Sequence, residues 1–244
     1  MNTRIYAINL DRSADRWARL SQQADQLNLE LTRVAGIDGH QLSAEERSQG
    51  DERSFRRNNG RTILPGEYGC YRSHLKALST FLASNHLVGI IVEDDIDLGH
   101  DLGKRVEAAF DALPTAEVIK LFNHRIVWFK HYTTSVLGDE IGRAAFGPQG
   151  STACYAVTRE GARKLIVGLE GMAYPWDIAL ERGWATGTHV YTTRSNLVGL
   201  AKHRTTIANR STYKGVKFPW WKRVATLFHR SAEAVRRINY ALRG

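Results

Sequence analysis

The strongest constraint on the fold of this chain is an apolar, β-branched run, Val88 to Val92, that ends abruptly in the carboxylates Glu93, Asp94 and Asp95. An apolar run of this length is typical of a buried strand rather than a helix. In an open α/β sheet, ligands bind in the crevice beyond the carboxyl ends of the strands. We therefore expect the three carboxylates to lie together at the rim of a cleft.

Adjacent carboxylates repel one another, and removing them from water is costly unless a cation offsets their charge. Hard oxygen ligands suit Mn²⁺ or Mg²⁺, and Mg²⁺ is commonly held by one or two carboxylates together with substrate phosphates. The cluster therefore predicts a divalent metal that holds a diphosphate, bound by Asp95 with Asp94 or Glu93. The stretch by itself leaves a second interpretation open, an acidic turn in solvent that binds nothing.

The rest of the chain alternates between strand-like and helix-like segments. The predicted strands include residues 5–10, 30–34, 118–122 and 153–157. The predicted helices include residues 13–27, 64–83 and 159–169. This alternation is typical of an α/β fold, here a Rossmann-like mixed sheet flanked by helices. The polar, glycine-containing residues 50–62 predict a mobile loop, or a flap over the site.

The composition is that of an ordinary globular enzyme. Of 244 residues, 43% are hydrophobic and 24% charged, so the chain can bury a core that needs no disulfides. The two cysteines, Cys70 and Cys154, lie far apart and match no metal-ligand spacing. The first residues lack the apolar core of a signal peptide, and no stretch is apolar enough to span a bilayer. We therefore expect a protein of the cytoplasm.

Polar residues follow the first predicted strand at its carboxyl end. They are Asn9, Asp11, Arg12 and Arg16. This position commonly contacts the base or ribose of a nucleotide, so we predict that these residues bind one. Helix capping and surface charge are the alternative roles, in particular for Arg12 and Arg16.

The predicted helix at 64–83 carries a second group of polar side chains. Glu67, Cys70 and His74 are spaced at i, i+3 and i+7, which puts them on one stripe beside the apolar face. We predict that Glu67 and His74 face the site and that Cys70 packs in the interior.

Two later segments supply further candidates. Asp177 precedes a short predicted helix, whose dipole favours a charged carboxylate, although a plain helix cap fits equally well. Residues 198–204 form a loop that ends in Lys202, His203 and Arg204. We predict that His203 completes the metal shell and that Lys202 or Arg204 pairs with phosphate.

Positive charge is concentrated at the C-terminus. Residues 214–244 hold eight Lys and Arg against one Glu, within a chain whose net charge is +9. Apolar residues recur there at helical spacing, and Arg223, Arg230 and Arg237 follow one another at intervals of seven. We predict a basic amphipathic helix that lies on an anionic membrane surface, with a helix docked on the core as the alternative. Charge confined to a tail argues against nucleic-acid binding.

Several motifs together make the chain similar to a known family. They are Ile8-Asn9-Leu10-Asp11-Arg12 with Arg16, Val34-Ala35-Gly36-Ile37-Asp38-Gly39, Leu64-Pro65-Gly66-Glu67-Tyr68-Gly69-Cys70 with Ser73-His74, Val92-Glu93-Asp94-Asp95, Gly150 to Tyr155, Gly161-Ala162 and Pro175-Trp176-Asp177. On these residues the chain resembles glycosyltransferase family 25, the lipopolysaccharide and lipooligosaccharide galactosyltransferase-like group, and the resemblance covers residues 4 to about 210 in order.

The resemblance implies a GT-A-like fold over residues 1–213, a UDP-sugar donor, in the first place UDP-galactose, and Mn²⁺ or Mg²⁺ at the acidic motif. It also implies an inverting reaction. The implied acceptor is a lipopolysaccharide, a lipooligosaccharide or a related glycan. Residues 214–244 lie outside the resemblance, and we assign them to a separate membrane-associating tail. We accordingly expect a peripheral enzyme on the inner face of the cell membrane.

An inverting transfer needs a carboxylate that accepts the proton of the acceptor hydroxyl as the new bond forms. We predict that Asp177 is this base and that Glu181, one helical turn further on, is its substitute. Two other functions stay open. The motif Asp95-Ile96-Asp97 after a strand is like that of an aspartate-based phosphohydrolase, and the basic tail would serve a non-catalytic membrane or nucleic-acid adaptor. Deletion of residues 214–244 should leave an enzyme active on a soluble acceptor.

Overall fold

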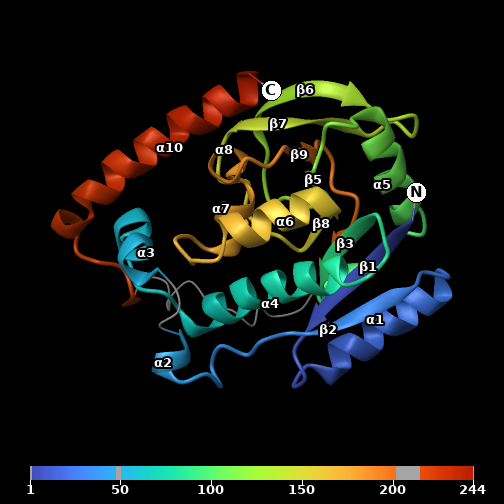
Figure 1. The fold of residues 1–244 in the computed structure, drawn as a ribbon, viewed down its shortest axis with the longest axis horizontal. Coiled ribbons are helices and arrows are strands. Elements are labelled where there is room, and N and C mark those ends of the chain that lie inside the picture. The colour runs from blue at the N-terminus through green and yellow to red at the C-terminus, as the bar shows by residue number, and fades with distance from the viewer. Residues whose placement is uncertain (1, 48–50, 202–214, 244) are drawn as a thin grey trace.

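The structure, a computed structural model, describes residues 2–47, 51–201 and 215–243. The strands are β1 (Thr3–Asn9), β2 (Leu31–Ala35), β3 (Val88–Glu93), β4 (Ile96–Asp97), β5 (Val118–Lys120), β6 (Val127–Thr134), β7 (Glu140–Phe146), β8 (Cys154–Thr158), β9 (Val190–Thr193) and β10 (Gly199–Leu200). Within the described residues, eight of them form one mixed sheet in the order β2-β1-β3-β8-β5-β9-β7-β6 (Figure 1). Strands β4 and β10 pair separately.

Helices flank this sheet, as the alternating pattern predicts. The α-helices are α1 (Ala14–Gln26), α2 (Ala44–Arg47), α3 (Glu52–Asn59), α4 (Pro65–Leu82), α5 (Leu102–Ala112), α6 (Arg159–Gly168), α7 (Trp176–Leu180), α8 (Gly183–Thr186) and α10 (Val224–Arg243), the last preceded by the 3-10 turn Trp220–Arg223. Side chains alternate across a strand. Ile90 and Val92 therefore pack with α1 and α5, whereas Ile91 packs with α4 and α6.

Strand direction brings the predicted site residues to one edge of the sheet. Strands β1, β2 and β3 are parallel neighbours, so their carboxyl ends lie together. Strand β8 runs antiparallel to both β3 and β5, which gives β5 the direction of β3, and β9 is parallel to β5. The turn at Asp94 and Asp95 therefore lies where five carboxyl ends converge. This arrangement confirms the expected mixed α/β fold.

The segment predicted as a mobile loop is mostly helical, so that prediction was wrong. Within residues 50–62, Glu52–Asn59 form α3, and the side chain of Asp51 caps the helix by accepting a hydrogen bond from the Ser54 backbone at 3.0 Å. Phe55 is fully buried in the core. One apolar residue in a polar stretch is a weak pattern in sequence, but its burial anchors the whole segment.

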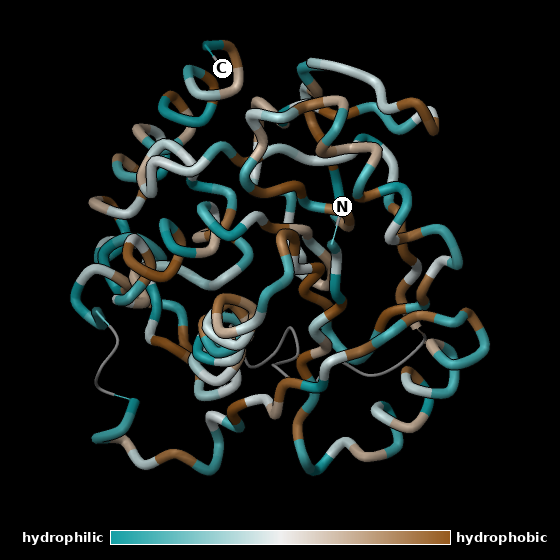
Figure 2. The backbone as a smooth tube through the Cα atoms, turned by 45° about the vertical axis from the view of Figure 1, so that its right-hand side comes forward, coloured by the Kyte–Doolittle hydropathy of each residue, from teal (hydrophilic) through white to brown (hydrophobic). Residues whose placement is uncertain are grey.

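Helix α10 docks on the core, and it does so with the side that the sequence pattern would leave in solvent. It lies along β7, α3 and α8 (Figure 1). Hydrophobic and hydrophilic residues follow one another along this helix in Figure 2. The buried positions include Arg237, on the arginine-bearing side. The apolar side chains are instead exposed, among them Val224, Leu227, Phe228, Val235 and Leu242.

The sequence left two roles open for the tail, a helix on a membrane surface and a helix docked on the core. The structure shows the docked helix, with its apolar side facing solvent. The division of the chain at residues 213 and 214 and the association of the tail with a membrane stay predictions. Among the described residues, no helix combines the length and apolarity needed to cross a bilayer.

Candidate active site

Two neighbouring pockets open at the carboxyl edge of the sheet. The N-terminal pocket lies between the end of β1, the loop at residues 37–40, α4 and the acidic turn. The α7 pocket lies between the acidic turn, the loop at residues 151–153 and the start of α7. Both are lined by the same three side chains, which we call the shared wall: Cys70, Glu93 and Asp95.

Asp94 is the carboxylate of the acidic turn whose charge is most fully compensated. Its Oδ2 accepts a hydrogen bond from Asn9 Nδ2 at 2.7 Å, and its Oδ1 lies 3.1 Å from Arg16 Nη1. Asn9 also donates to the Ser13 carbonyl, and its Oδ1 accepts two hydrogen bonds from Arg33. The amide of Asn9 is therefore fully engaged within the protein and positions Asp94. Its predicted contact with a nucleotide stays a prediction.

Asp95 is the carboxylate with the least compensation. Burial, and then the neighbouring carboxylates Glu93 and Asp94, raise the pKa of Asp95 to about 6. Its Oδ1 is buried and has no hydrogen-bond partner among the described residues. An anion held in this way is stabilised by any cation that approaches it. Asp95 therefore has both the charge and the free oxygen that a metal ligand needs.

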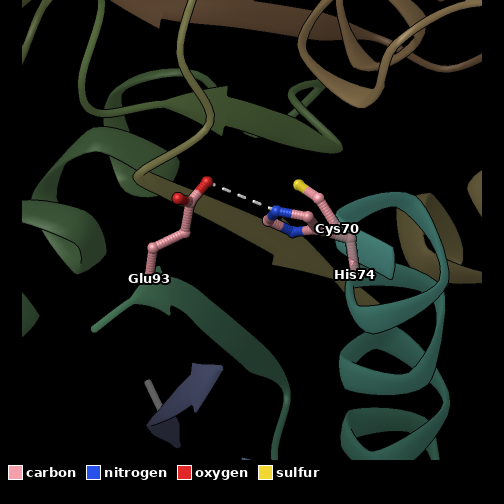
Figure 3. A group of neighbouring side chains, drawn as sticks. All are labelled: Cys70, His74 and Glu93. Carbon is pink, nitrogen blue, oxygen red and sulfur yellow. Dashed lines mark ion pairs between the residues drawn. The ribbon is translucent and has the colours of Figure 1, made fainter. Parts of the chain in front are cut away.

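Glu93 lines both pockets, as Asp95 does. Its Oε1 accepts a hydrogen bond from Thr152 at 3.2 Å and lies 3.5 Å from His74 Nε2 (Figure 3). Burial would raise the pKa of Glu93, but His74, Thr152 and Arg16 outweigh it, and the net pKa is lowered. Glu93 is therefore ionised in the range where Asp95 titrates.

The predicted basic contacts of the N-terminal pocket are partly present. Arg12 and Arg16 both line it, and Arg12 Nε lies 3.1 Å from Asp38 Oδ2. Asp11 is placed differently, because its exposed carboxylate pairs with Arg33 at 2.7 Å outside the pocket lining. Asp38 was missed by sequence reasoning, although it stands in a Gly-Ile-Asp-Gly turn that follows β2 at the same sheet edge.

Glu67 and His74 both reach the site, but their roles differ. Glu67 lines the α7 pocket, yet its two oxygens accept hydrogen bonds from Arg61 at 2.6 and 2.5 Å. It also accepts one from the Leu64 backbone, which secures the start of α4. His74 lines the N-terminal pocket and is almost fully buried. Glu67 therefore acts mainly in holding α4 in place.

Asp177 lies at the start of α7 and lines the α7 pocket, as the shared wall does. Burial, and then the nearby carboxylate of Glu181, raise the pKa of Asp177. A carboxylate with a raised pKa accepts a proton more readily once it is ionised. The pocket position and the pKa direction both suit the predicted role of Asp177 as a base.

Glu181 does not suit the role of substitute base. Its side chain is completely buried and lines neither pocket, and it pairs with Lys120 Nζ at 2.8 Å and Arg237 Nη1 at 2.9 Å. It also accepts a hydrogen bond from the Gln149 backbone. Burial would raise the pKa of Glu181, but the two cations outweigh it and lower the pKa. Glu181 therefore binds α7 to β5 and to α10 instead of facing a substrate.

Lys120, the fully buried partner of Glu181, was missed from the sequence. A signal was present, because Lys120 interrupts the otherwise apolar strand Val118 to Phe122. A charge in a buried strand needs a partner of opposite sign. The predicted metal ligand His203, with Lys202 and Arg204, lies outside the described residues, so its role stays a prediction.

Comparison with known proteins gives one family match and two similar proteins. Residues 2–180 match the family described as "Glycosyltransferase family 25 (LPS biosynthesis protein)". Proteins of Aedes aegypti and Anopheles gambiae, each described as "Glycosyltransferase 25 family member", are 25% and 26% identical to this chain over 181 residues. The alignments cover 66% of this chain but 27% and 28% of those proteins, so the chain spans about a quarter of the length of the curated relatives it matches.

The buried ion triad predicts how α10 contributes to stability. Replacing Arg237 with Met leaves the buried Glu181 with one cation instead of two, which should lower the free energy of unfolding by about 3 kcal/mol. The neighbouring variant Arg236→Met is the control, because Arg236 is exposed and pairs with Glu233 at the surface. It should cost less than about 1 kcal/mol in urea denaturation. Equal losses in the two variants would contradict the triad.

The raised pKa of Asp95 predicts a pH-dependent stability. A raised pKa means that the protonated form is favoured in the folded state, so this stability is full below about pH 4 and is lost as the pH rises through about 6. Asp95→Asn should therefore exceed the wild type in free energy of unfolding by about 3 kcal/mol at pH 8 and match it near pH 3.5. Asp97→Asn, whose carboxylate pairs with Arg19, should show no such gain. Urea denaturation at both pH values tests the difference.

Proposed function

Because the chain belongs to glycosyltransferase family 25, we propose that it is an inverting, metal-dependent glycosyltransferase. It would move a hexose, galactose in the first place, from a UDP-sugar to a lipopolysaccharide, a lipooligosaccharide or a related glycan. The observation that carries the proposal is the pair of pockets on either side of the shared wall. A transfer between two substrates needs two binding sites that meet at the reacting atom, and this geometry offers them.

We assign the donor to the N-terminal pocket. Arg12 and Arg16 bring positive charge to its lining, and guanidinium groups are suited to phosphate oxygens. The pocket also lies beyond the carboxyl ends of β1 and β3, where nucleotides bind in α/β sheets. The choice of UDP and of galactose follows from the family resemblance and not from any contact in the pocket.

The acidic turn fits the hard divalent cation that the proposal requires. Asp95 offers a buried oxygen without a hydrogen-bond partner among the described residues, and Glu93 lies beside it on the shared wall. Asp95 and Glu93 would hold Mn²⁺ or Mg²⁺, as predicted, and both are hard oxygen ligands. When bound, such an ion supplies Lewis-acid stabilisation of the charge that develops on the departing diphosphate.

We assign the acceptor to the α7 pocket and proton removal to Asp177. As the acceptor oxygen bonds to the anomeric carbon, the bond from that carbon to the diphosphate oxygen breaks. The acceptor hydroxyl loses its proton to the Asp177 carboxylate. Attack from the α7 side, opposite the diphosphate, inverts the anomeric configuration. Trp176, which precedes Asp177 and lines the same pocket, is buried against His74 and Tyr71, so it holds the start of α7 in place beside the pocket.

The exposed side of α10 supports the membrane association that we propose for residues 214–244. Phe228 and Leu242 are 72% and 61% exposed on the same side of the helix. Trp220, just before α10, is 72% exposed. Lys222 and Arg243 are exposed near the two ends of this segment, and apolar residues together with basic ones are the combination that binds an anionic lipid surface. A peripheral position on the inner face of the cell membrane would bring the enzyme to a lipid-linked acceptor.

The two rival functions are less well supported. In a phosphohydrolase of the predicted type, Asp95 and Asp97 would share one site. Asp97 instead pairs with Arg19 at 2.8 Å on β4, outside the lining of both pockets. A non-catalytic adaptor does not need a poorly compensated carboxylate, Asp95, between two pockets. Deletion of residues 214–244 does not distinguish the enzyme from the adaptor. The deletion also removes Arg237 and leaves the buried Glu181 with one cation, so a loss of activity could come from a loss of stability.

Donor binding and transfer can be tested separately with two variants. Isothermal calorimetry of the wild type should show UDP binding that requires Mn²⁺, and Asp95→Asn should abolish the metal-dependent part. Asp177→Asn should keep UDP binding but lose roughly 10²–10⁴-fold in sugar transfer, because only the proton acceptor is missing. Glu170→Gln, on the exposed surface, is the control. Transfer by Asp177→Asn at the wild-type rate would reject this base, and UDP binding that ignores Mn²⁺ would reject the metal.

Membrane association is tested by removing the outward apolar stripe without touching the buried side of α10. The double variant Phe228→Ser with Leu242→Ser should bind vesicles that contain phosphatidylserine about tenfold more weakly or worse, because two large apolar side chains no longer enter the interface. Val167→Ser on α6, which is 80% exposed, is the matched control and should bind like the wild type. Unchanged co-sedimentation of the double variant would refute the proposed surface.

A further inference from the structure

A thiol, an imidazole and a carboxylate converge beside the acidic turn (Figure 3). Cys70 and His74 are four residues apart on α4, so their side chains project from the same face of the helix. Glu93 approaches them from the end of β3. One potential ligand atom from each residue lies within 4.8 Å of the other two. Two rigid elements therefore hold three different donor atoms around one point.

The imidazole of His74 is fixed in an orientation that leaves one nitrogen without a hydrogen bond. Its ring stacks on Trp176 at 5.0 Å between centroids, and Nδ1 lies 3.3 Å from the Tyr155 hydroxyl. Nε2 is buried, faces Glu93 and has no hydrogen-bond partner among the described residues. In the neutral tautomer that carries its proton on Nδ1 and donates it to Tyr155, the lone pair of Nε2 is available to an ion placed between His74 and Glu93.

The combination of donors selects the kind of ion. Thiolate and imidazole are ligands for Zn²⁺, whereas Mn²⁺ and Mg²⁺ prefer carboxylate, carbonyl and water oxygens. Three protein ligands leave a fourth tetrahedral position open. Cys70 and Glu93 line both pockets, so this position is reachable by water or by a ligand. Outer partners such as Tyr155 commonly orient a metal-binding histidine.

We propose that Cys70, His74 and Glu93 form a Zn²⁺ site next to the hard-cation site at Asp95, with Glu93 common to both. On binding, the Cys70 thiol releases its proton to solvent, and the sulfur, His74 Nε2 and a Glu93 oxygen each form one bond to the ion. No oxidation or reduction takes place. Zn²⁺ in this site would engage Glu93 and so oppose the Mn²⁺ or Mg²⁺ of the transferase. Only this last consequence rests on the proposed function.

The site can be detected without any sugar substrate. Titration of the full chain with Co²⁺, a spectroscopic substitute for Zn²⁺, should produce a near-ultraviolet charge-transfer band from thiolate to cobalt and tetrahedral visible bands. Stoichiometric Zn²⁺ should remove both. Absence of the charge-transfer band in the wild type would overturn the proposal, and Cys70, His74 and Glu93 would then be an ion pair beside a neutral thiol. Because no nucleotide is present, this failure is distinct from failure of the transferase assignment.

The second cysteine provides the matched control. Cys70→Ala should lose the charge-transfer band, and Cys154→Ala, which removes a buried thiol outside the cluster, should keep it. Tyr155→Phe should keep the band but weaken Zn²⁺ binding by roughly 10–100-fold, as loss of an outer partner does. If Cys70→Ala does not fold by circular dichroism, the comparison of Tyr155→Phe with wild type still decides. A band that survives in Cys70→Ala, or equal Zn²⁺ affinity in Tyr155→Phe and wild type, would refute the site.

Discussion

Repulsion among the three carboxylates at the end of β3 is the constraint around which this edge of the protein is organised. The fold resolves it unequally. Asp94 is stabilised by Asn9 and Arg16, whereas Glu93 accepts a hydrogen bond from Thr152 and lies beside His74. Asp95 keeps a raised pKa and an oxygen without a hydrogen bond among the described residues. The uncompensated charge thus lies on the wall between two pockets, where a bound cation would be most useful to a transferase.

A second group of buried charges connects that edge to the C-terminal helix. Glu181 on α7 is held between Lys120 of β5 and Arg237 of α10. Breaking such an arrangement is costly, because the remaining charge stays buried. Helix α10 therefore turns Arg237 to the core, and large apolar residues such as Phe228 and Leu242 are left facing outward. The same carboxylate raises the pKa of Asp177, so the tail and the proposed base are coupled through Glu181.

Most secondary structure could be predicted from the sequence, because the apolar periodicity of strands and helices is local. The helices at 13–27, 64–83 and 159–169 are present within one or two residues of their expected ends. Residues 50–62 were misjudged because the burial of one aromatic side chain, Phe55, outweighs a polar composition. Asp177 lines the α7 pocket, whereas Glu181, one turn away, lines neither of the two pockets, because it is held by Lys120 and Arg237, two partners that no local sequence pattern indicates.

The sequence alone determined that carboxylates would crowd at the end of a buried strand, because the order of apolar and acidic residues is written in the chain. It also determined that the last segment would be a helix with one apolar and one basic side. Only the tertiary structure decided which charges are compensated and which side of α10 is buried. Those outcomes depend on partners 24 to 85 residues away in sequence, such as Asn9 for Asp94 and Arg33 for Asn9, and on the low tolerance of the interior for an unpaired charge.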